Sequence, residues 1–315
     1  MNNELSYYSI HNDAQNINYA FNRVLRKKNI GKDDSTYLTF IKSAEAQYYQ
    51  LPEESKKAYD KALADENLFR RIGTVTDVSV STGSVIVTAT DGSAEIVPPE
   101  TAFPDNDDTI SESTFNTHKI ASMCKLNNAF VRDKNYDIQK YLRNTFARRF
   151  GRKEEDVFIN GTGTDEPKGI LASAEIGRTV VGDDFTADDL IKLYFSLDKH
   201  MRKNATWVMS DETALKVRTM KDGAGNYLWK DDTILGRPVE ISNYMEDATK
   251  PVAFGDFSFF WIIQRSPLSV KVLSELYSLQ DKTGYVGYET LDGKLIRSDA
   301  IKLLLLEEEE SPDSE

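Results

Sequence analysis

The most informative stretch of the sequence is Val157-Phe-Ile-Asn-Gly-Thr-Gly-Thr-Asp-Glu-Pro-Lys-Gly-Ile-Leu171, which follows a long amphipathic segment that begins near Asn135. The residues of that segment that recur at three- and four-residue spacing share one face of a predicted helix: Ile138, Tyr141, Leu142, Phe146 and Arg149. The glycines that follow predict a turn with backbone angles that only glycine tolerates. This turn ends the helix.

A glycine-rich loop beside a helix is also typical of phosphate sites, but this loop does not fit them. A P-loop has glycine directly before its lysine, whereas Lys168 follows Pro167, which has no backbone N–H to donate. Asp165 and Glu166 would repel a phosphate. The dinucleotide-binding pattern also fails, because Glu166 stands where a third glycine is required. The sequence therefore indicates a structural turn.

Other segments in a fixed order extend this observation to most of the chain: Lys125–Asp133, Ala205–Ser210, Lys221–Trp229, Ile234–Val239 and Ala253–Phe257. Together with the glycine-rich turn, they resemble the major capsid proteins of tailed bacteriophages, whose fold is named after phage Hong Kong 97. The resemblance covers about Phe69 to Leu306.

The resemblance implies an α+β fold of the Hong Kong 97 capsid type, with an axial domain, a peripheral domain around a long spine helix, an extended β-hairpin loop and an N-terminal helical arm. We expect the following parts: an N-terminal helical arm or small helical domain at 1–66, the extended loop at 67–120, the peripheral domain at 121–171 and 250–306, the axial domain at 172–249, and a disordered acidic tail at 307–315.

The first part reads as three helices. One apolar stripe contains Ile17, Ala20, Phe21, Val24 and Leu25, and a second contains Tyr37, Ile41, Ala44 and Tyr48. Pro52 opens the third helix at the position that proline favours. In the resembling proteins this region is either an arm that wraps a neighbour or a segment removed by a protease. Nothing in the sequence marks a cleavage site, so we expect the segment to be retained.

An alternating pattern from Gly73 to Ala89 predicts a long, half-exposed β-hairpin, with turns at Gly83 and at Asp91-Gly92. Such a ribbon has too little core to be stable alone. We therefore expect it to lie on an adjacent subunit, which is what the resemblance also implies. Between Arg71 and Lys119 there are eight acidic residues and no lysine or arginine, so the partner surface should be basic.

The candidate subunit-contact residues are the acidic Asp105, Asp107 and Asp108 and the basic Arg148, Arg149, Arg152 and Lys153. A second interpretation of the basic residues is that they only complement the C-terminus of their helix. Some relatives join subunits through an isopeptide bond that starts from a loop lysine. Because this loop has no lysine, we expect a shell held by non-covalent contacts.

In the predicted axial part, Thr186 and Asp189 indicate a helix start, followed by Leu190, Tyr194, Leu197 and Met201 on one face. Trp207–Met209 should be a short buried strand, Ser210 the cap of the next helix, and the region around Asp222-Gly223 and Gly225 a loop. Further strands are expected in the last part, with a hairpin turn at Leu291–Lys294: 259–263, 269–273, 285–289 and 296–306. These strands should complete the peripheral domain around the spine helix.

Composition restricts the other classes of function. The 315 residues are 40% hydrophobic, and the sequence shows neither a run of about 18 apolar residues nor a secretory signal. Cys124 is the only cysteine, so we expect a buried structural thiol. The net charge of −12 argues against a nucleic-acid reader. It suits either a container whose wall repels packed DNA or simple solubility.

The sequence offers no catalytic constellation. His11, His118 and His200 are not at metal-ligand spacing, and no Gly-x-Ser-x-Gly motif is present. Adjacent acidic pairs are expected by chance among 51 acidic residues. Phe254–Trp261 should be sheet core or a subunit contact, because the bases that a stacking platform needs are missing around it. We therefore expect no enzyme activity, no cofactor and no metal.

We interpret the chain as a major capsid protein that self-assembles through pentamers and hexamers into an icosahedral shell around phage double-stranded DNA, without sequence-specific binding. The glycine-rich helix end and the hairpin would serve as joints between non-identical lattice positions. The resemblance implies assembly in the host cytoplasm and a place in the virion capsid. Further implied partners are a scaffolding protein, a maturation protease, a portal and decoration proteins. An encapsulin-type nanocompartment and a nucleotide-dependent enzyme are the alternatives.

Overall fold

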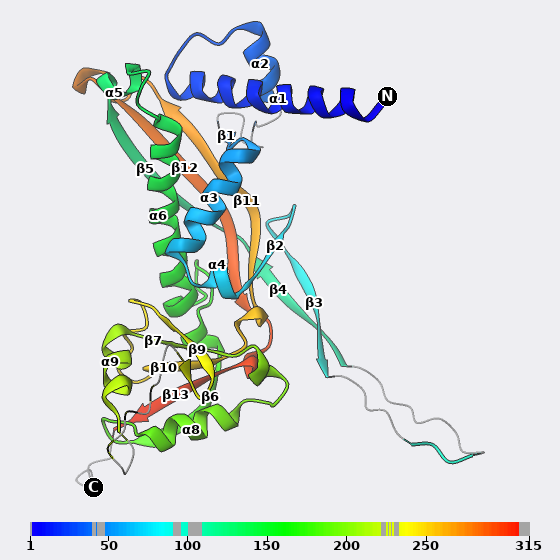
Figure 1. The fold of residues 1–315 in the computed structure, drawn as a ribbon, viewed down its shortest axis with the longest axis vertical. Coiled ribbons are helices and arrows are strands. Elements are labelled where there is room, and N and C mark those ends of the chain that lie inside the picture. The colour runs from blue at the N-terminus through cyan, green and yellow to red at the C-terminus, as the bar shows by residue number, and fades with distance from the viewer. Residues whose placement is uncertain are drawn as a thin grey trace. The chain divides into compact units, whose positions relative to one another are not determined.

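The computed structural model describes residues 2–39, 42, 48–90, 96–99, 109–221, 225, 227, 229 and 233–308, and Figure 1 shows the arrangement. The chain combines helices with antiparallel and mixed sheets, which confirms the predicted α+β class. It divides into two compact units: the first contains 1–71, 118–156 and 264–291, and the second contains 72–117, 157–263 and 292–315.

The first unit packs helices on a five-stranded sheet, four strands of which follow the order β1-β11-β12-β5: β1 (Tyr49–Gln50), β11 (Phe260–Leu273), β12 (Lys282–Leu295) and β5 (His118–Asn127). Strand β2 (Thr74–Asp77) also pairs with β11. The α-helices that begin in this unit are α1 (Asn2–Leu25), α2 (Lys32–Thr39), α3 (Glu53–Glu66), α4 (Phe69–Ile72), α5 (Asn128–Arg132) and the long α6 (Ile138–Asn160). A short 3₁₀ turn, η3 (Ser278–Gln280), precedes β12.

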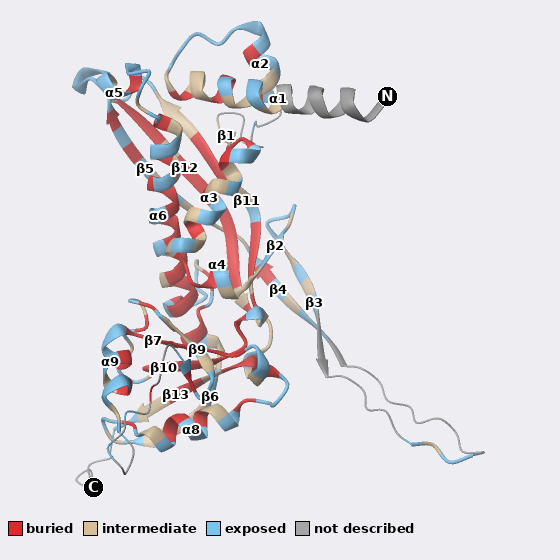
Figure 2. Cartoon of the chain, viewed as in Figure 1, coloured by how far each residue is buried: buried red, intermediate tan, exposed pale blue. Residues whose placement is uncertain are grey.

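The predicted apolar face of α6 is mostly confirmed. Ile138, Leu142 and Phe146 are buried in the core of the first unit, whereas Tyr141 and Arg149 lie at its exposed edge. Gly287 of β12 allows the close packing of helix and sheet, since a Cβ there would lie 3.0 Å from the Phe146 ring. Figure 2 shows this buried face of α6 against the sheet.

The first predicted N-terminal stripe is also confirmed, because Ala20, Phe21 and Leu25 of α1 are fully buried. The second predicted stripe is wrong at its C-terminal end, because Tyr48 does not lie in a helix. Helix α2 stops at Thr39, and Tyr49 pairs with Val270 of β11 as part of β1. Tertiary pairing with the sheet overrides the helical spacing there. Ile41 and Ala44 lie outside the described residues. Pro52 is the N-cap of α3, one position before the predicted one.

The second unit contains a six-stranded mixed sheet in the order β6-β13-β10-β7-β9-β8. Its strands are β6 (Glu175–Val181), β7 (Thr206–Met209), β8 (Thr233–Ile234), β9 (Arg237–Ile241), β10 (Val252–Gly255) and β13 (Ile301–Glu307). The helices α7 (Ile170–Ser173), α8 (Ala187–Ser196) and α9 (Asp211–Thr219) belong to it, with the 3₁₀ turns η1 (Met201–Lys203), η2 (Phe257–Phe259) and η4 (Ser298–Ala300).

The predicted helix starts in this unit are confirmed, but α8 ends at Ser196, so Leu197 is its C-cap and Met201 lies in η1. Thr186 and Asp189 form a capping box at the start of α8, where the Thr186 hydroxyl donates to Asp189 Oδ2 at 2.7 Å. Ser210 Oγ accepts from the backbone N–H of Thr213 at 3.1 Å and caps α9. The Trp207–Met209 strand is fully buried within β7. Residues 222–224 of the predicted loop lie outside the described residues.

The predicted turn at Leu291–Lys294 is wrong, because β12 runs without a break through these residues. Asp292 Oδ2 accepts from the backbone N–H of Asn116 at 3.0 Å. A Cβ on Gly293 would lie 2.4 Å from the Phe158 ring. Asp292 therefore accepts a hydrogen bond, and Gly293 leaves room for the Phe158 ring, so the pair does not form a turn.

The strand pairing of the last part also differs from the expectation that all of its strands surround α6. β11 and β12 are neighbours in the sheet of the first unit, but β10 pairs with β7 and β13 pairs with β6 in the six-stranded sheet. The expected strand at 296–306 begins only at Ile301, because η4 precedes it. Strand pairing over long sequence separations is not visible in local patterns.

A β-hairpin is present, but with other strands than predicted. β3 (Thr82–Thr90) pairs antiparallel with β4 (Thr109–Asn116), from Thr82 opposite Asn116 to Thr90 opposite Thr109. Gly83 lies inside β3 and not in a turn, which corrects the sequence interpretation. A Cβ at this position would lie 2.8 Å from the ring of Phe115, so glycine makes room for that ring. Asp91-Gly92 lies outside the described residues.

Candidate functional site

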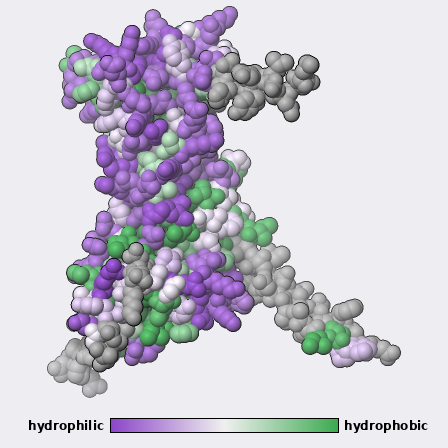
Figure 3. Space-filling model, in the orientation of Figure 1, coloured by the Kyte–Doolittle hydropathy of each residue, from purple (hydrophilic) through white to green (hydrophobic). Residues whose placement is uncertain are grey.

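The hairpin β3–β4 leaves apolar side chains uncovered. Ile86 is 70% exposed and Ile96, in the connection between the two strands, is fully exposed. Figure 3 shows hydrophobic surface on the described part of this connection. Lys294 Nζ, which donates to the Thr114 carbonyl at 2.5 Å, holds the base of the hairpin. The ribbon is thus anchored at its base, and its described part carries exposed apolar side chains.

The acidic contact candidates Asp105, Asp107 and Asp108 lie in this connection but outside the described residues. The basic candidates lie on α6, and three of them already bond within the first unit. Arg149 Nη1 donates to the Met123 carbonyl at 2.7 Å, Arg152 Nε pairs with Glu66 Oε2 at 3.1 Å, and Lys153 Nζ pairs with Asp156 Oδ2 at 2.9 Å.

All four basic candidates are exposed, and Arg148 is the one with no hydrogen bond or ion pair inside the described part of the chain. The interpretation that these bases complement a helix C-terminus does not hold. α6 continues to Asn160 and its last turn contains no base. A favourable helix-dipole contribution is confined to the last turn.

The glycine-rich turn closes on itself through a network of short contacts. The N–H of Thr162 donates to Glu166 Oε1 at 3.0 Å, and the N–H of Gly169 donates to the Gly161 carbonyl at 2.9 Å. Thr162 also forms an isolated bridge with Lys168. Because these N–H groups already have acceptors within the chain, the turn does not form an anion cradle. The predicted left-handed glycine is confirmed at Gly163, with φ of 83°.

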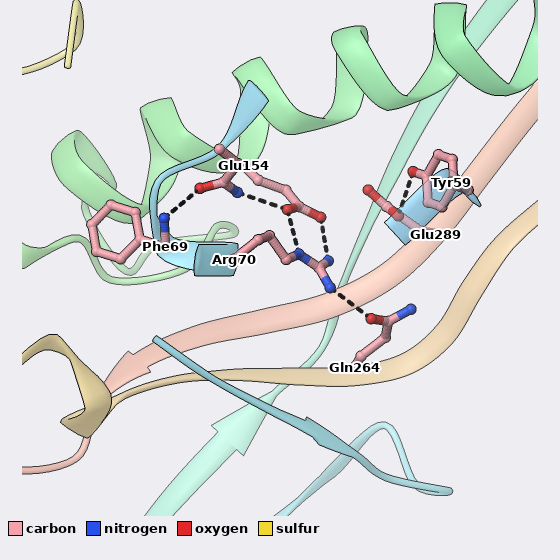
Figure 4. Close-up of polar contacts among 7 residues, drawn as sticks. Tyr59, Phe69, Arg70, Glu154, Gln264 and Glu289 are labelled. Atoms are coloured by element: carbon pink, nitrogen blue, oxygen red, sulfur yellow. Dashed lines mark hydrogen bonds and ion pairs between the residues drawn. The ribbon is translucent and has the colours of Figure 1, made fainter. Parts of the chain in front are cut away.

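The first unit contains a buried charge cluster that the sequence patterns did not reveal, formed by Tyr59, Arg70, Glu154 and Glu289 (Figure 4). The Arg70 guanidinium binds the Glu154 carboxylate through two nitrogens, at 2.9 Å from Nε to Oε2 and 2.6 Å from Nη2 to Oε1. Its third nitrogen, Nη1, donates to Gln264 Oε1 of β11 at 2.9 Å. One arginine thereby connects α4, α6 and β11.

The backbone around Arg70 is fixed to α6 by the neighbouring residues. Asn67 Nδ2 donates to Glu154 Oε2 at 2.8 Å, and the N–H of Leu68 donates to Glu155 Oε2 at 2.9 Å. Asn67 Oδ1 in turn accepts from the N–H of Phe69 at 2.9 Å. The segment that precedes the hairpin is therefore bound to the long helix through charged hydrogen bonds, which are stronger than neutral ones.

Glu289 of β12 is the second carboxyl group of the cluster and is fully buried. Its Oε2 accepts from the Tyr59 hydroxyl at 3.1 Å, while its Oε1 has no donor among the described residues. Burial raises the pKa of Glu289, and the nearby Glu154 carboxylate raises it further. Because Glu154 already holds the arginine, we assign the neutral, protonated state to Glu289.

Burial is also the first cause that raises the pKa of the Tyr59 hydroxyl, with Glu289 second, so Tyr59 stays a donor. In Cys124, burial raises the pKa of the thiol more than Arg149 lowers it. This agrees with the expected buried structural thiol, which is 4% exposed.

Within the described ranges, no three histidine, cysteine or acidic side chains come together as a metal site. No described helix is both long and apolar enough to cross a membrane. The arrangement consists of packing surfaces, a fixed turn and an exposed ribbon.

The Phage capsid family matches residues 48–305. No curated protein gives a significant match.

Several solved structures are similar over most of the chain. The "Capsid of native GTA particle computed with C5 symmetry" is 29% identical, with a TM-score of 0.63, and the alignment covers 76% of this chain and 89% of that one. The capsid of the empty GTA particle is also 29% identical, with a TM-score of 0.67 over 76% and 90% of the two chains. The structure from Mycobacterium phage Bobi is 17% identical with a TM-score of 0.58, over 76% and 90%, and supports the fold alone.

Proposed function

The chain belongs to the phage capsid family, as a structural protein of the capsid shell, and on this premise we propose that its copies form a closed icosahedral particle around double-stranded DNA. The observation that carries the proposal is the family match over residues 48–305, together with capsid structures that align over 76% of the chain. The comparisons favour neither the encapsulin-type shell nor the nucleotide-dependent enzyme.

The exposed hairpin supports the proposal physically. A two-stranded ribbon is marginally stable by itself. Ile86 and Ile96 are exposed, so their apolar surface is not buried against the chain that carries them. A neighbouring copy would cover them. Burying apolar surface is the main favourable term in most protein association, at about 25 cal/mol per Å². In this view the chain is incomplete without its neighbours.

The loop at 67–120 reaches a neighbour in this proposal. The region 172–249 acts as the axial domain, together with β10 and β13, which pair in its sheet. The region 121–171 with the rest of 250–306 acts as the peripheral domain. The candidate subunit-contact residues stay part of the proposal: Asp105, Asp107, Asp108, Arg148, Arg149, Arg152 and Lys153. Assembly in the host cytoplasm, and cooperation with scaffolding, protease, portal and decoration proteins, also belong to the proposal.

Expression of the full chain in bacteria, followed by sedimentation and negative-stain microscopy, tests the proposal. We expect closed particles of uniform size. The same expression is repeated with the neighbouring phage genes, because some shells require a separate scaffold. A chain that stays monomeric under both conditions, and at every salt concentration tried, would contradict the proposal.

A further inference from the structure

A basic pocket lies in the first unit, between the C-terminal part of α1 and the connection from α5 to α6. Its volume is about 390 Å³, and four of its lining residues are cationic: Arg23, Arg26, Lys28 and Lys134. No lining residue is acidic. Figure 3 shows that the visible face over α1 and α2 is predominantly hydrophilic. The pocket thus concentrates positive charge in a chain whose net charge is −12.

The pocket is a fixed structure. Arg26 donates to three backbone carbonyls of the α5–α6 region, at 3.1 Å to Val131, 2.5 Å to Asp133 and 2.5 Å to Tyr136. These bonds tie the end of α1 to the segment that carries Lys134. Arg26 and the backbone that carries Lys134 are therefore held in place before any ligand arrives, which lowers the entropic cost of binding.

Part of the positive charge is uncompensated. Arg23 Nη1 pairs with Asp34 at 3.1 Å, but its buried Nε has no acceptor among the described residues. Lys28 and Lys134 are exposed and make no ion pair inside the described part of the chain. By contrast, the α6 bases Arg149, Arg152 and Lys153 are already engaged.

We propose that this basic pocket binds the acidic connection of the hairpin, residues 91–108, from a second copy of the chain. The inference rests on the proposed shell function and names the surface that receives the ribbon. The connection contains six acidic residues and no lysine or arginine: Asp91, Glu95, Glu100, Asp105, Asp107 and Asp108. Its charge complements the pocket, and opposite potentials steer association and fix the binding mode.

The apolar contacts agree with this occupant. Tyr19 lines the pocket and is 63% exposed, and the connection presents the fully exposed Ile96 next to two prolines. The acidic C-terminal residues 307–315 have comparable charge but no large apolar side chain. The pocket offers positive charge and an apolar ring. The connection of the hairpin matches both features, whereas the acidic tail matches only the charge.

The test uses the full chain with Lys28→Glu and Lys134→Glu together. We expect this variant to fold as the wild type does, by circular dichroism, and to lose particle assembly. Adding Asp105→Lys, Asp107→Lys and Asp108→Lys should restore particles. The matched control is Lys57→Glu with Lys61→Glu on the exposed side of α3, which should assemble normally. Normal assembly of the Lys28/Lys134 variant, or failure of the second charge reversal to restore it, would overturn the inference.

A binding measurement keeps the inference testable if the chain does not assemble in the laboratory. A labelled peptide of residues 91–108 is titrated with unassembled full-length chain at low salt, and fluorescence anisotropy is recorded. We expect binding that weakens at least about tenfold with the Lys28/Lys134 variant, and also when the three aspartates are replaced by asparagine.

Two further outcomes of the titration would overturn the assignment. One is tighter binding of a peptide of residues 307–315, which would make the tail the occupant. The other is binding of a DNA duplex through Lys28 and Lys134 without binding of the 91–108 peptide. Wild-type particles with an unaffected Lys28/Lys134 variant would reject this inference and leave the shell function standing.

Discussion

Two acidic side chains, Glu154 and Glu289, are buried near one guanidinium in the interior of the first unit, and the two have different roles. Glu154 binds Arg70 through both oxygens, whereas Glu289 contacts Tyr59 and has one oxygen without a donor in the described residues. Two buried anions beside a single cation would leave one charge uncompensated, which is costly in a dry interior. A proton on Glu289 removes that cost.

The pH dependence of folding follows from this proton. Because burial and Glu154 raise the pKa of Glu289 above its ordinary value of 4.5, the folded state keeps a proton that the unfolded state releases. The stabilisation is complete below about pH 4.5 and is lost as the pH rises through the folded-state pKa. Glu289→Gln, which imitates the neutral acid, should remove this pH dependence and should not destabilise the subunit at neutral pH.

The matched variant is Glu154→Gln, an equally small change on the other carboxyl group. It leaves Arg70 buried without its anion, so we expect a loss of about 3 to 5 kcal/mol in the free energy of unfolding. Urea denaturation of unassembled subunits at about pH 5 and about pH 8 measures both variants. If Glu289→Gln costs as much as Glu154→Gln at neutral pH, then Glu289 is charged in the folded state and the assignment is wrong.

The sequence could not have revealed this cluster. Arg70 and Glu154 are 84 positions apart, and Tyr59 and Glu289 are 230 apart. Nothing in their neighbourhoods distinguishes them from the other acidic and basic residues. Their environment is created by the packing of α3, α4 and α6 on β12, which is a property of the folded chain.

At the level of elements, the signals that were predicted correctly are those whose physical cause is local. The capping box of Thr186 and Asp189 and the Ser210 cap each involve atoms three residues apart. Asp292-Gly293 failed as a turn because its partners, Asn116 and Phe158, are distant in sequence. The same residue types serve a turn or a close approach, and only tertiary contacts distinguish the two uses.

The glycine-rich turn after α6 gives the sharpest prediction at this scale. A Cβ on Gly161 would lie 2.1 Å from the Pro167 carbonyl oxygen and 2.4 Å from that of Val157. Both are backbone atoms, which cannot move without opening the turn. Gly161→Ala should therefore destabilise the second unit by more than about 3 kcal/mol, or prevent its folding.

Gly182→Ala is the control for backbone strain alone. Gly182 has φ of 116°, and a Cβ there would meet nothing within 4 Å. We expect this variant to cost about 1 kcal/mol. Urea denaturation followed by tryptophan fluorescence reports on this unit, because Trp207 is in its core. Equal costs for both variants would show that the turn relaxes easily and would support a flexible joint instead of a fixed one.

On the scale of the whole molecule, the family and fold class were predictable because motif order is a one-dimensional property of the sequence. The assignment of strands to the two sheets was not, since β10 and β13 pair with strands far away in the chain. Contacts between copies depend on surfaces that a single chain leaves open. The basic pocket at α1 was not predicted, because its lining residues are spread from 18 to 139 in the sequence. The α6 bases were predicted as candidate contacts because they lie close together in the sequence.

The charge distribution along the chain also decides how its shell is held together. An isopeptide bond that starts from the hairpin requires a lysine amine there, and no lysine lies between Arg71 and Lys119. Assembled particles boiled in detergent should therefore give a single band at the position of the monomer on a denaturing gel. Their stability should also decrease as salt rises, because contacts between the acidic hairpin and a basic surface are screened within about 10 Å at 0.1 M salt. A ladder of covalent oligomers, or particles indifferent to salt, would mean that the copies are joined by other residues than those of the hairpin.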